Sequence, residues 1–316
     1  MPGLLDIILG YDCNLACTYC TITEAMRARA LPARAVAAEL SRGRSNGFDK
    51  VSFTGGEPTI RADLLPLVRR AADLGYRSIK VQSNGLLLGV GDNAARLLDA
   101  GVTCVQISIH THEVEAYEAM VRREGTHQHM QRGLEILAAS DVELGADVIL
   151  ESDTLPRLPS AVDWLAARGV RAADLWFVSL TDGNANRPQS LPRMSEAVPF
   201  IAEARTRAQA HGMRLRSLHI PPCILGVHAD LAHNPALQRV RVVSPDAVFD
   251  LADSAITPRE HVPACDGCEH RAQCGGLRPD YISEFGDVEV ARARSVEPSQ
   301  QGRRRLPLAT SAEPRG

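Results

Sequence analysis

Short apolar runs rich in β-branched residues alternate along this chain with longer stretches whose apolar positions recur every three or four residues. The short runs predict strands at Leu4–Leu9, Lys50–Phe53, Ser78–Gln82, Val102–Ile109, Glu143–Leu150 and Leu175–Leu180. The longer stretches predict helices at Ala33–Arg42, Leu64–Leu74, Asn93–Ala100, His127–Ala138 and Leu158–Arg168. This alternation is typical of β-α units on a parallel sheet, so the sequence predicts an α/β fold.

The pattern changes after Leu180. Residues 181–192 are rich in Gly, Asn and Pro and predict a loop, and a helix is expected at Met194–His211. Four of the eight cysteines follow it, which indicates a second module. We therefore predict a barrel domain at residues 1–212, a cysteine-rich module at residues 213–292 and a disordered tail at residues 293–316.

Composition and charge exclude several classes of function. The 316 residues are 45% hydrophobic with a formal net charge of −3, and the one basic run is Arg303–Arg305, so no nucleic-acid partner is expected. No stretch has the length of a membrane span or the form of a signal peptide, which predicts a cytoplasmic protein without a membrane partner. Eight cysteines in a reducing compartment favour metal binding over disulfides.

Three of these cysteines, Cys13, Cys17 and Cys20, form a C-x3-C-x2-C triplet with Tyr19 before the last one. Their thiolates can bind three corners of a cubic iron–sulfur cluster and leave the fourth iron open. A zinc knuckle is the alternative, but zinc needs a fourth ligand, and the next cysteine, Cys104, is distant in sequence.

A second motif, Gly55-Gly56-Glu57-Pro58, directly follows the second predicted strand. The two glycines allow close approach of the backbone to a ligand, and the glutamate can accept hydrogen bonds from an ammonium group. Together with the cysteine triplet, this motif resembles the signature of the radical S-adenosylmethionine (radical SAM) enzymes. The resemblance implies a partial (β/α)6 TIM-like barrel, a [4Fe–4S] cluster on the three cysteines, and SAM held by these four residues.

Further SAM contacts are implied by the same resemblance. Asn84 lies in a Ser-Asn-Gly turn after the third strand, Ser108 ends the fourth strand, and Arg123 follows in Met120–Arg123. The alternatives are an ordinary turn residue or a solvated charge. His110 and His112 lie just past the fourth strand, where one of them is a candidate proton acceptor for the substrate. Loop histidines without a catalytic role are the alternative.

The remaining cysteines, Cys223, Cys265, Cys268 and Cys274, resemble the SPASM/twitch extension of radical SAM enzymes. Since no cysteine follows Cys274, they suffice for one auxiliary [4Fe–4S] cluster of the shorter twitch type. The alternative is a zinc ribbon, in which the same four thiolates hold the module together.

Strand parity predicts a polar barrel lumen. In the fourth strand Val105, Ile107 and Ile109 should face the helices, which places Gln106 and Ser108 inside. The same argument places Lys80, Gln82 and Asp147 inside from neighbouring strands. These groups either form a buried network or bind a polar substrate; we favour a network for Lys80 and Asp147.

The resemblance implies that SAM is reductively cleaved to a 5′-deoxyadenosyl radical, which abstracts a hydrogen atom from the substrate. We expect a net oxidation of a small polar molecule of the sugar or aminocyclitol type, with the auxiliary cluster accepting an electron. A flavodoxin or ferredoxin is expected as electron donor. The polar lumen and the twelve residues before Cys13 favour a small molecule over a peptide. The alternatives are a maturase of ribosomal peptides and a non-catalytic iron–sulfur or zinc protein.

Overall fold

The computed structural model describes residues 3–233, 238–253 and 259–295. Its centre is one nine-stranded sheet. The strands are β1 (Gly3–Ile8), β2 (Phe48–Thr54), β3 (Ser78–Ser83), β4 (Cys104–Ser108), β5 (Glu143–Leu150), β6 (Ala172–Phe177), β7 (Arg214–Leu218), β8 (Arg239–Val243) and β9 (Val248–Asp250). They lie in the order β7-β6-β5-β4-β3-β2-β1-β8-β9, and every pair is parallel except the antiparallel β8 and β9.

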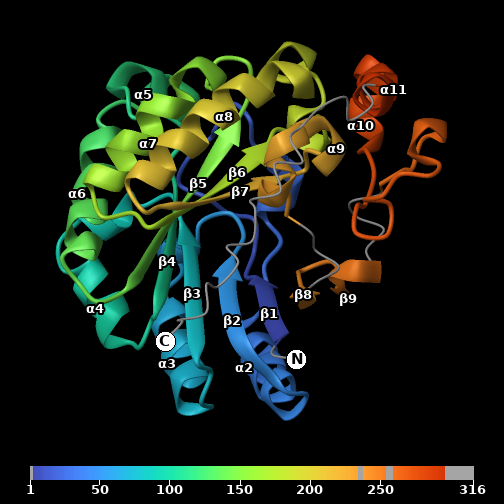
Figure 1. Ribbon diagram of the computed structural model, residues 1–316. Coiled ribbons are helices and arrows are strands. Elements are labelled where there is room, and N and C mark those ends of the chain that lie inside the picture. Colours follow the sequence, from blue (N-terminus) through green and yellow to red (C-terminus); the bar gives the residue numbers. More distant parts are fainter. Residues whose placement is uncertain (1–2, 234–237, 254–258, 296–316) are drawn as a thin grey trace, which may run out of the picture.

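Helices cover the outer face of this curved sheet (Figure 1). The α-helices of the described residues are α1 (Glu24–Arg27), α2 (Ala33–Ser45), α3 (Leu64–Asp73), α4 (Asn93–Asp99), α5 (Val114–Val121), α6 (Thr126–Ala138), α7 (Leu158–Ala167), α8 (Met194–Ala210), α9 (Pro222–Leu225), α10 (Pro279–Phe285) and α11 (Val288–Ser295). The predicted fold class, an α/β partial TIM-like barrel, is confirmed. In such an arrangement the carboxyl ends of the strands meet at one mouth, where chemistry is usually placed.

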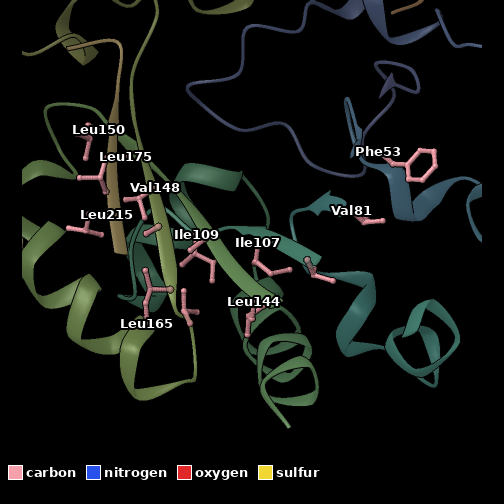
Figure 2. Close-up of a cluster of buried hydrophobic side chains, with 14 of the residues drawn as sticks. Phe53, Val81, Ile107, Ile109, Leu144, Val148, Leu150, Leu165, Leu175 and Leu215 are labelled. Carbon is pink, nitrogen blue, oxygen red and sulfur yellow. The ribbon is translucent and has the colours of Figure 1, made fainter. Parts of the chain in front are cut away.

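The core lies between the sheet and the helices, as strand parity predicted. Val105, Ile107 and Ile109 are at most 1% exposed. Figure 2 shows Ile107 and Ile109 lying with Val148 of β5 and Leu165 of α7. The alternate positions of β4 and β5 therefore face the lumen of the barrel.

The domain boundary predicted at residue 212 is wrong for the sheet. β7 pairs with β6, and β8 pairs with β1, so both strands extend the barrel sheet on its two sides. β7 escaped prediction because arginines interrupt its apolar positions: Arg216 forms an ion pair with Asp174 on β6, and that partner is distant in sequence. The sheet-forming part of the chain thus reaches residue 250.

The C-terminal end also differs from the prediction. α11 continues to Ser295, three residues into the segment predicted as a tail, and its Glu289 accepts hydrogen bonds from Ser195 of α8 and Tyr281 of α10. Residues 296–316 of that predicted tail lie outside the described residues. Among the helices that the structure describes, none combines the length and the apolar character needed to cross a bilayer.

Candidate functional site

The cysteine triplet lies in the loop that leaves the carboxyl end of β1. Three arginines from separate parts of the chain fix the backbone of this loop by donating to its carbonyl oxygens. These contacts are Arg27 to Cys13 and Leu15 at 2.8 Å each, Arg123 to Asn14 at 3.1 Å, and Arg187 to Thr18 at 2.6 Å. The sequence analysis named Arg123 for another role and missed Arg27 and Arg187, because single arginines carry little signal in an arginine-rich chain.

The Gly55–Glu57 segment packs directly on the start of the cysteine loop. Gly56 N–H donates to the Gly10 carbonyl at 2.9 Å, and Glu57 N–H donates to the Asp12 carbonyl at 2.8 Å. A Cβ on Gly56 would lie 2.0 Å from the Asp12 oxygen, and one on Gly55, whose φ is +134°, would lie 2.3 Å from the Gly10 oxygen. The two glycines thus permit close contact between two backbone segments. The sequence analysis had instead assigned them to close approach of the backbone to a ligand.

Glu57 joins this segment to the turn after β3. Its side chain is 2% exposed; Oε1 accepts hydrogen bonds from Thr59 and, at 2.8 Å, from Ser83 Oγ, while Oε2 accepts from Asn84 N–H at 2.7 Å. Burial raises the pKa of this carboxyl, and the hydrogen bonds oppose the shift. Each carboxylate oxygen can accept about two hydrogen bonds, so Oε2 has room for one further donor.

Two more predicted SAM contacts reach the same loop. The Asn84 amide donates to Asn14 Oδ1 at 2.8 Å and lies 3.9 Å from Cys13 Sγ, and Arg123 contacts the Asn14 carbonyl. The fold therefore brings Gly55–Pro58, Asn84 and Arg123 to the cysteine triplet. Ser108 ends β4 opposite Asp147 in the lumen, and its SAM contact stays a prediction.

The two candidate histidines lie in different surroundings. His110 is 3% exposed and contacts Tyr19 of the cysteine loop and the backbone of β5. His112 lies in the helical layer, with its ring centroid 6.4 Å from that of Trp164 on α7. His110 lies just past β4 beside the cysteine loop, but its burial makes it poorly placed to exchange protons with solvent. A catalytic role for either histidine stays a prediction.

Asp147 is the centre of a hydrogen-bond network in the lumen. Its carboxylate accepts from Gln82 at 2.5 Å, Gln106 at 3.0 Å and the Trp176 indole at 2.8 Å. Burial raises the pKa of Asp147 to about 6, the nearby Asp174 adds to the rise, and the charge of Lys80 opposes it. The predicted network thus exists, with Trp176 as a member that the sequence analysis missed and Lys80 acting through its charge.

This raised pKa predicts a dependence of stability on pH. Between about pH 4 and pH 6 the folded protein retains a proton on Asp147 that the unfolded chain has released, so stability falls as the pH rises through this window. The full shift corresponds to about 3 kcal/mol. Urea unfolding of the wild type and of Asp147→Asn at pH 4, 5, 6 and 7 should show this extra loss in the wild type alone. Parallel stability curves for the two proteins would contradict it.

The four C-terminal cysteines meet although Cys223 is far from the others in sequence. Cys223 on α9 and the cysteines Cys265, Cys268 and Cys274 line one small cavity. Within the described ranges, no three His, Cys, Asp or Glu side chains converge as a site for a single metal ion. A four-iron cluster needs wider spacing, since each sulfur binds a different iron. All-thiolate donors around one cavity fit such a cluster.

The donor set at the N-terminal loop also fits a cluster. Cys13, Cys17 and Cys20 are free thiols that lie close enough for their charges to interact. The pKa of Cys17 is raised to about 12, mainly by burial and in smaller part by the neighbouring thiols, while a hydrogen bond from Tyr19 opposes the shift. A bound metal cation, such as the iron of a cluster, would compensate three thiolates gathered here.

Comparison with known proteins agrees with this geometry. Residues 7–157 match the family model described as the radical SAM superfamily. The chain is 31% identical over 156 residues to a probable GTP 3′,8-cyclase of Methanopyrus kandleri, covering 49% of this chain and 50% of that protein. It is 33% identical over 148 residues to an AdoMet-dependent heme synthase of Oleidesulfovibrio alaskensis, covering 46% and 37%. The chain thus spans half or less of the length of these relatives.

Solved structures show a similar fold. Streptococcus suis SuiB bound to the precursor peptide SuiA superimposes with a TM-score of 0.68 at 13% identity, covering 88% of this chain and 72% of that one. The anSMEcpe protein with bound AdoMet gives a TM-score of 0.54 at 16% identity, covering 68% and 64%. At these identities the likeness concerns the fold alone.

Proposed function

Since residues 7–157 of this chain form a radical SAM domain, we propose that this radical SAM enzyme oxidises a small polar molecule bound in the barrel lumen. Cys13, Cys17 and Cys20 would hold a [4Fe–4S] cluster, and Gly55–Pro58, Asn84, Ser108 and Arg123 would hold SAM. When bound, these groups supply one-electron reductive cleavage of SAM and a 5′-deoxyadenosyl radical that abstracts hydrogen.

One observation carries this proposal: the cysteine loop is docked on the Gly55–Glu57 segment by backbone hydrogen bonds that tolerate no Cβ. Two motifs 35 or more residues apart are thereby joined into one rigid site at the carboxyl ends of β1 and β2. Within it, Glu57 fixes the turn at Asn84 and keeps acceptor capacity on Oε2. That capacity suits the ammonium group of SAM.

The lumen supports a polar substrate. Asp147 accepts two hydrogen bonds on Oδ1 and one on Oδ2, which leaves Oδ2 able to accept from a substrate hydroxyl or amine. The half-buried Trp176 ring beside it offers an apolar face. None of the relatives named above acts, by name, on a sugar or aminocyclitol, so we propose the wider class of small polar molecules. A peptide maturase is the second candidate, favoured by the fold of SuiB.

We further propose that the C-terminal cysteines hold an auxiliary [4Fe–4S] cluster that accepts an electron from the substrate, in a module comprising α9 and residues 259–295. The four thiolates that line one cavity support this proposal, and a zinc site with the same four ligands is the alternative. A flavodoxin or ferredoxin would donate the electron for SAM cleavage.

Anaerobic reconstitution with iron and sulfide, followed by metal counting and incubation with SAM and dithionite, tests both parts. About eight irons per chain and formation of 5′-deoxyadenosine are expected. About four irons with one zinc and continued 5′-deoxyadenosine formation would refute the auxiliary cluster alone. No SAM cleavage by a chain that holds its iron, even with extracts containing candidate small molecules or peptides, would refute the catalytic proposal.

A further inference from the structure

A cavity of about 710 Å³ lies at the amino ends of the strands, at the opposite end of the barrel from the cysteine triplet. Its wall includes the first residues of six strands, Ser78, Cys104, Glu143, Ala172, Arg214 and Arg239. Of the described residues that donate hydrogen bonds to Asp147, Gln106 alone lines it. Cavities of this volume accommodate small molecules. The cavity is thus a compartment separate from the proposed SAM and substrate sites.

The charges on the wall of this cavity do not balance. Among the described residues that line it, six side chains are cationic and three are acidic. Each acid forms an ion pair with an arginine: Glu143 with Arg214 at 3.1 Å, Asp174 with Arg216 at 2.5 Å, and Asp230 with Arg205 at 2.6 Å. The cations without such a carboxylate partner are Lys50, Lys80 and Arg239. Three surplus positive charges therefore line the cavity, in a chain whose formal net charge is −3.

Two of these surplus cations are the only lysines of the chain. Lys50 on β2 and Lys80 on β3 both line this one cavity. Neither amine forms a hydrogen bond or an ion pair with another described residue. The buried carboxyls of Asp6 and Asp147 interact with the charge of Lys80 without an ion pair to it, and burial raises the pKa of both. Positive charges gathered at a concave surface without carboxylate partners attract an anion.

The third surplus cation, Arg239, is held in place by contacts with the segment before β2 and with β2 itself. It donates to the Asn46 carbonyl at 3.1 Å, and its guanidinium carbon lies 4.2 Å from the centroid of the Phe48 ring. We propose that this cavity binds a small phosphate-bearing molecule through Lys50, Lys80 and Arg239. A phosphate group presents oxygens in several directions and can meet point charges from separate strands, whereas the two oxygens of a carboxylate suit the planar fork of one arginine.

Isothermal titration calorimetry of the full chain at physiological salt tests this site, with inorganic pyrophosphate as the probe. We expect saturable binding of pyrophosphate and weaker binding of citrate, which carries a similar charge on carboxylates. Ribose 5-phosphate is the second phosphate probe: tighter binding than pyrophosphate would assign the site to a phosphate ester, and weaker binding would assign it to inorganic diphosphate. If neither phosphate bound, or if citrate bound as tightly as pyrophosphate, the proposal would be overturned.

Lys50→Met is the main variant, because Lys50 is exposed near the start of β2 and its loss should leave the fold intact. We expect this variant to weaken pyrophosphate binding about tenfold, and Lys80→Met to weaken it at least as much, since each removes one charged contact. Arg69→Met, at an exposed position of α3, is the matched control that loses the same charge outside the cavity wall. An unchanged affinity in Lys50→Met, or an equal loss in Arg69→Met, would contradict binding in the cavity.

The two lysines also report where the ligand binds. Acetic anhydride modifies amines, and peptide mass spectrometry of the digested chain measures the acetylation of Lys50 and Lys80 separately. Pyrophosphate should slow both reactions more than citrate does. Equal rates with and without pyrophosphate would place the bound ion elsewhere and overturn the proposal. Both measurements can be made with or without bound iron, so a chain that assembles no cluster would refute the proposed function and leave this site untouched.

Discussion

Cys17→Ala is expected to lose about four irons per reconstituted chain and to form no 5′-deoxyadenosine above background. Two thiolates cannot replace the three that the loop presents, and the open iron needed for SAM disappears with the cluster. Iron counting and chromatographic detection of 5′-deoxyadenosine after incubation with SAM and dithionite measure both effects. This is the largest change in activity that the site predicts.

Cys104→Ala is the matched control for this variant. Cys104 is half-buried on β4 and lines a cavity at the amino ends of the strands, at the opposite end of the barrel from the cysteine triplet. It should keep the iron content and SAM cleavage of the wild type. Cys268→Ala should lose about four irons through the auxiliary site alone. Equal iron contents in Cys17→Ala and Cys104→Ala would show that the triplet holds no cluster.

The regular part of the fold could be predicted because its signals are local. β5 has the predicted bounds Glu143–Leu150, and α3 and α7 begin at the predicted residues and end within one residue of the prediction. β7 and β8 could not be found in this way. Arg216 and Arg241 interrupt the apolar pattern of these strands, and each donates hydrogen bonds to an aspartate on the neighbouring strand, Asp174 or Asp250. Because these partners come close only in the folded sheet, the local sequence did not indicate a strand.

In the candidate site, too, local motifs could be predicted from the sequence, whereas contacts between residues distant in sequence could not. The cysteine triplet and the Gly55–Pro58 motif each lie within a short segment of the chain, so both could be recognised from sequence. The partners of those segments could not. Arg187 reaches Thr18 across 169 residues and His110 reaches Tyr19 across 91, and no local pattern marks either pair. Only the curved arrangement of the strands brings such residues together.

Gly56→Ala is expected to destabilise the fold by about 3 kcal/mol or more and to prevent assembly of the N-terminal cluster. The new Cβ would lie 2.0 Å from the Asp12 carbonyl oxygen, a distance that only a backbone shift can relieve. That shift would break the hydrogen bond from Glu57 N–H to Asp12 and move the cysteine loop off its support. Urea unfolding gives the stability, and iron counting gives the occupancy of the loop.

Gly212→Ala is the control that distinguishes the steric clash at residue 56 from the general free-energy cost of replacing a glycine. Gly212 has a φ of +64°, and a Cβ there would meet no atom of the described residues within 4 Å. Its replacement should cost about 1–2 kcal/mol through the left-handed backbone alone and leave the iron content unchanged. Gly56 does not have a positive φ, so its replacement carries no such backbone cost. If Gly56→Ala loses more stability than Gly212→Ala and also loses iron, the cause is the contact between the two backbone segments. If Gly56→Ala instead matched Gly212→Ala in stability and in iron content, close packing at Gly55 and Gly56 would not be what holds the cysteine loop in place.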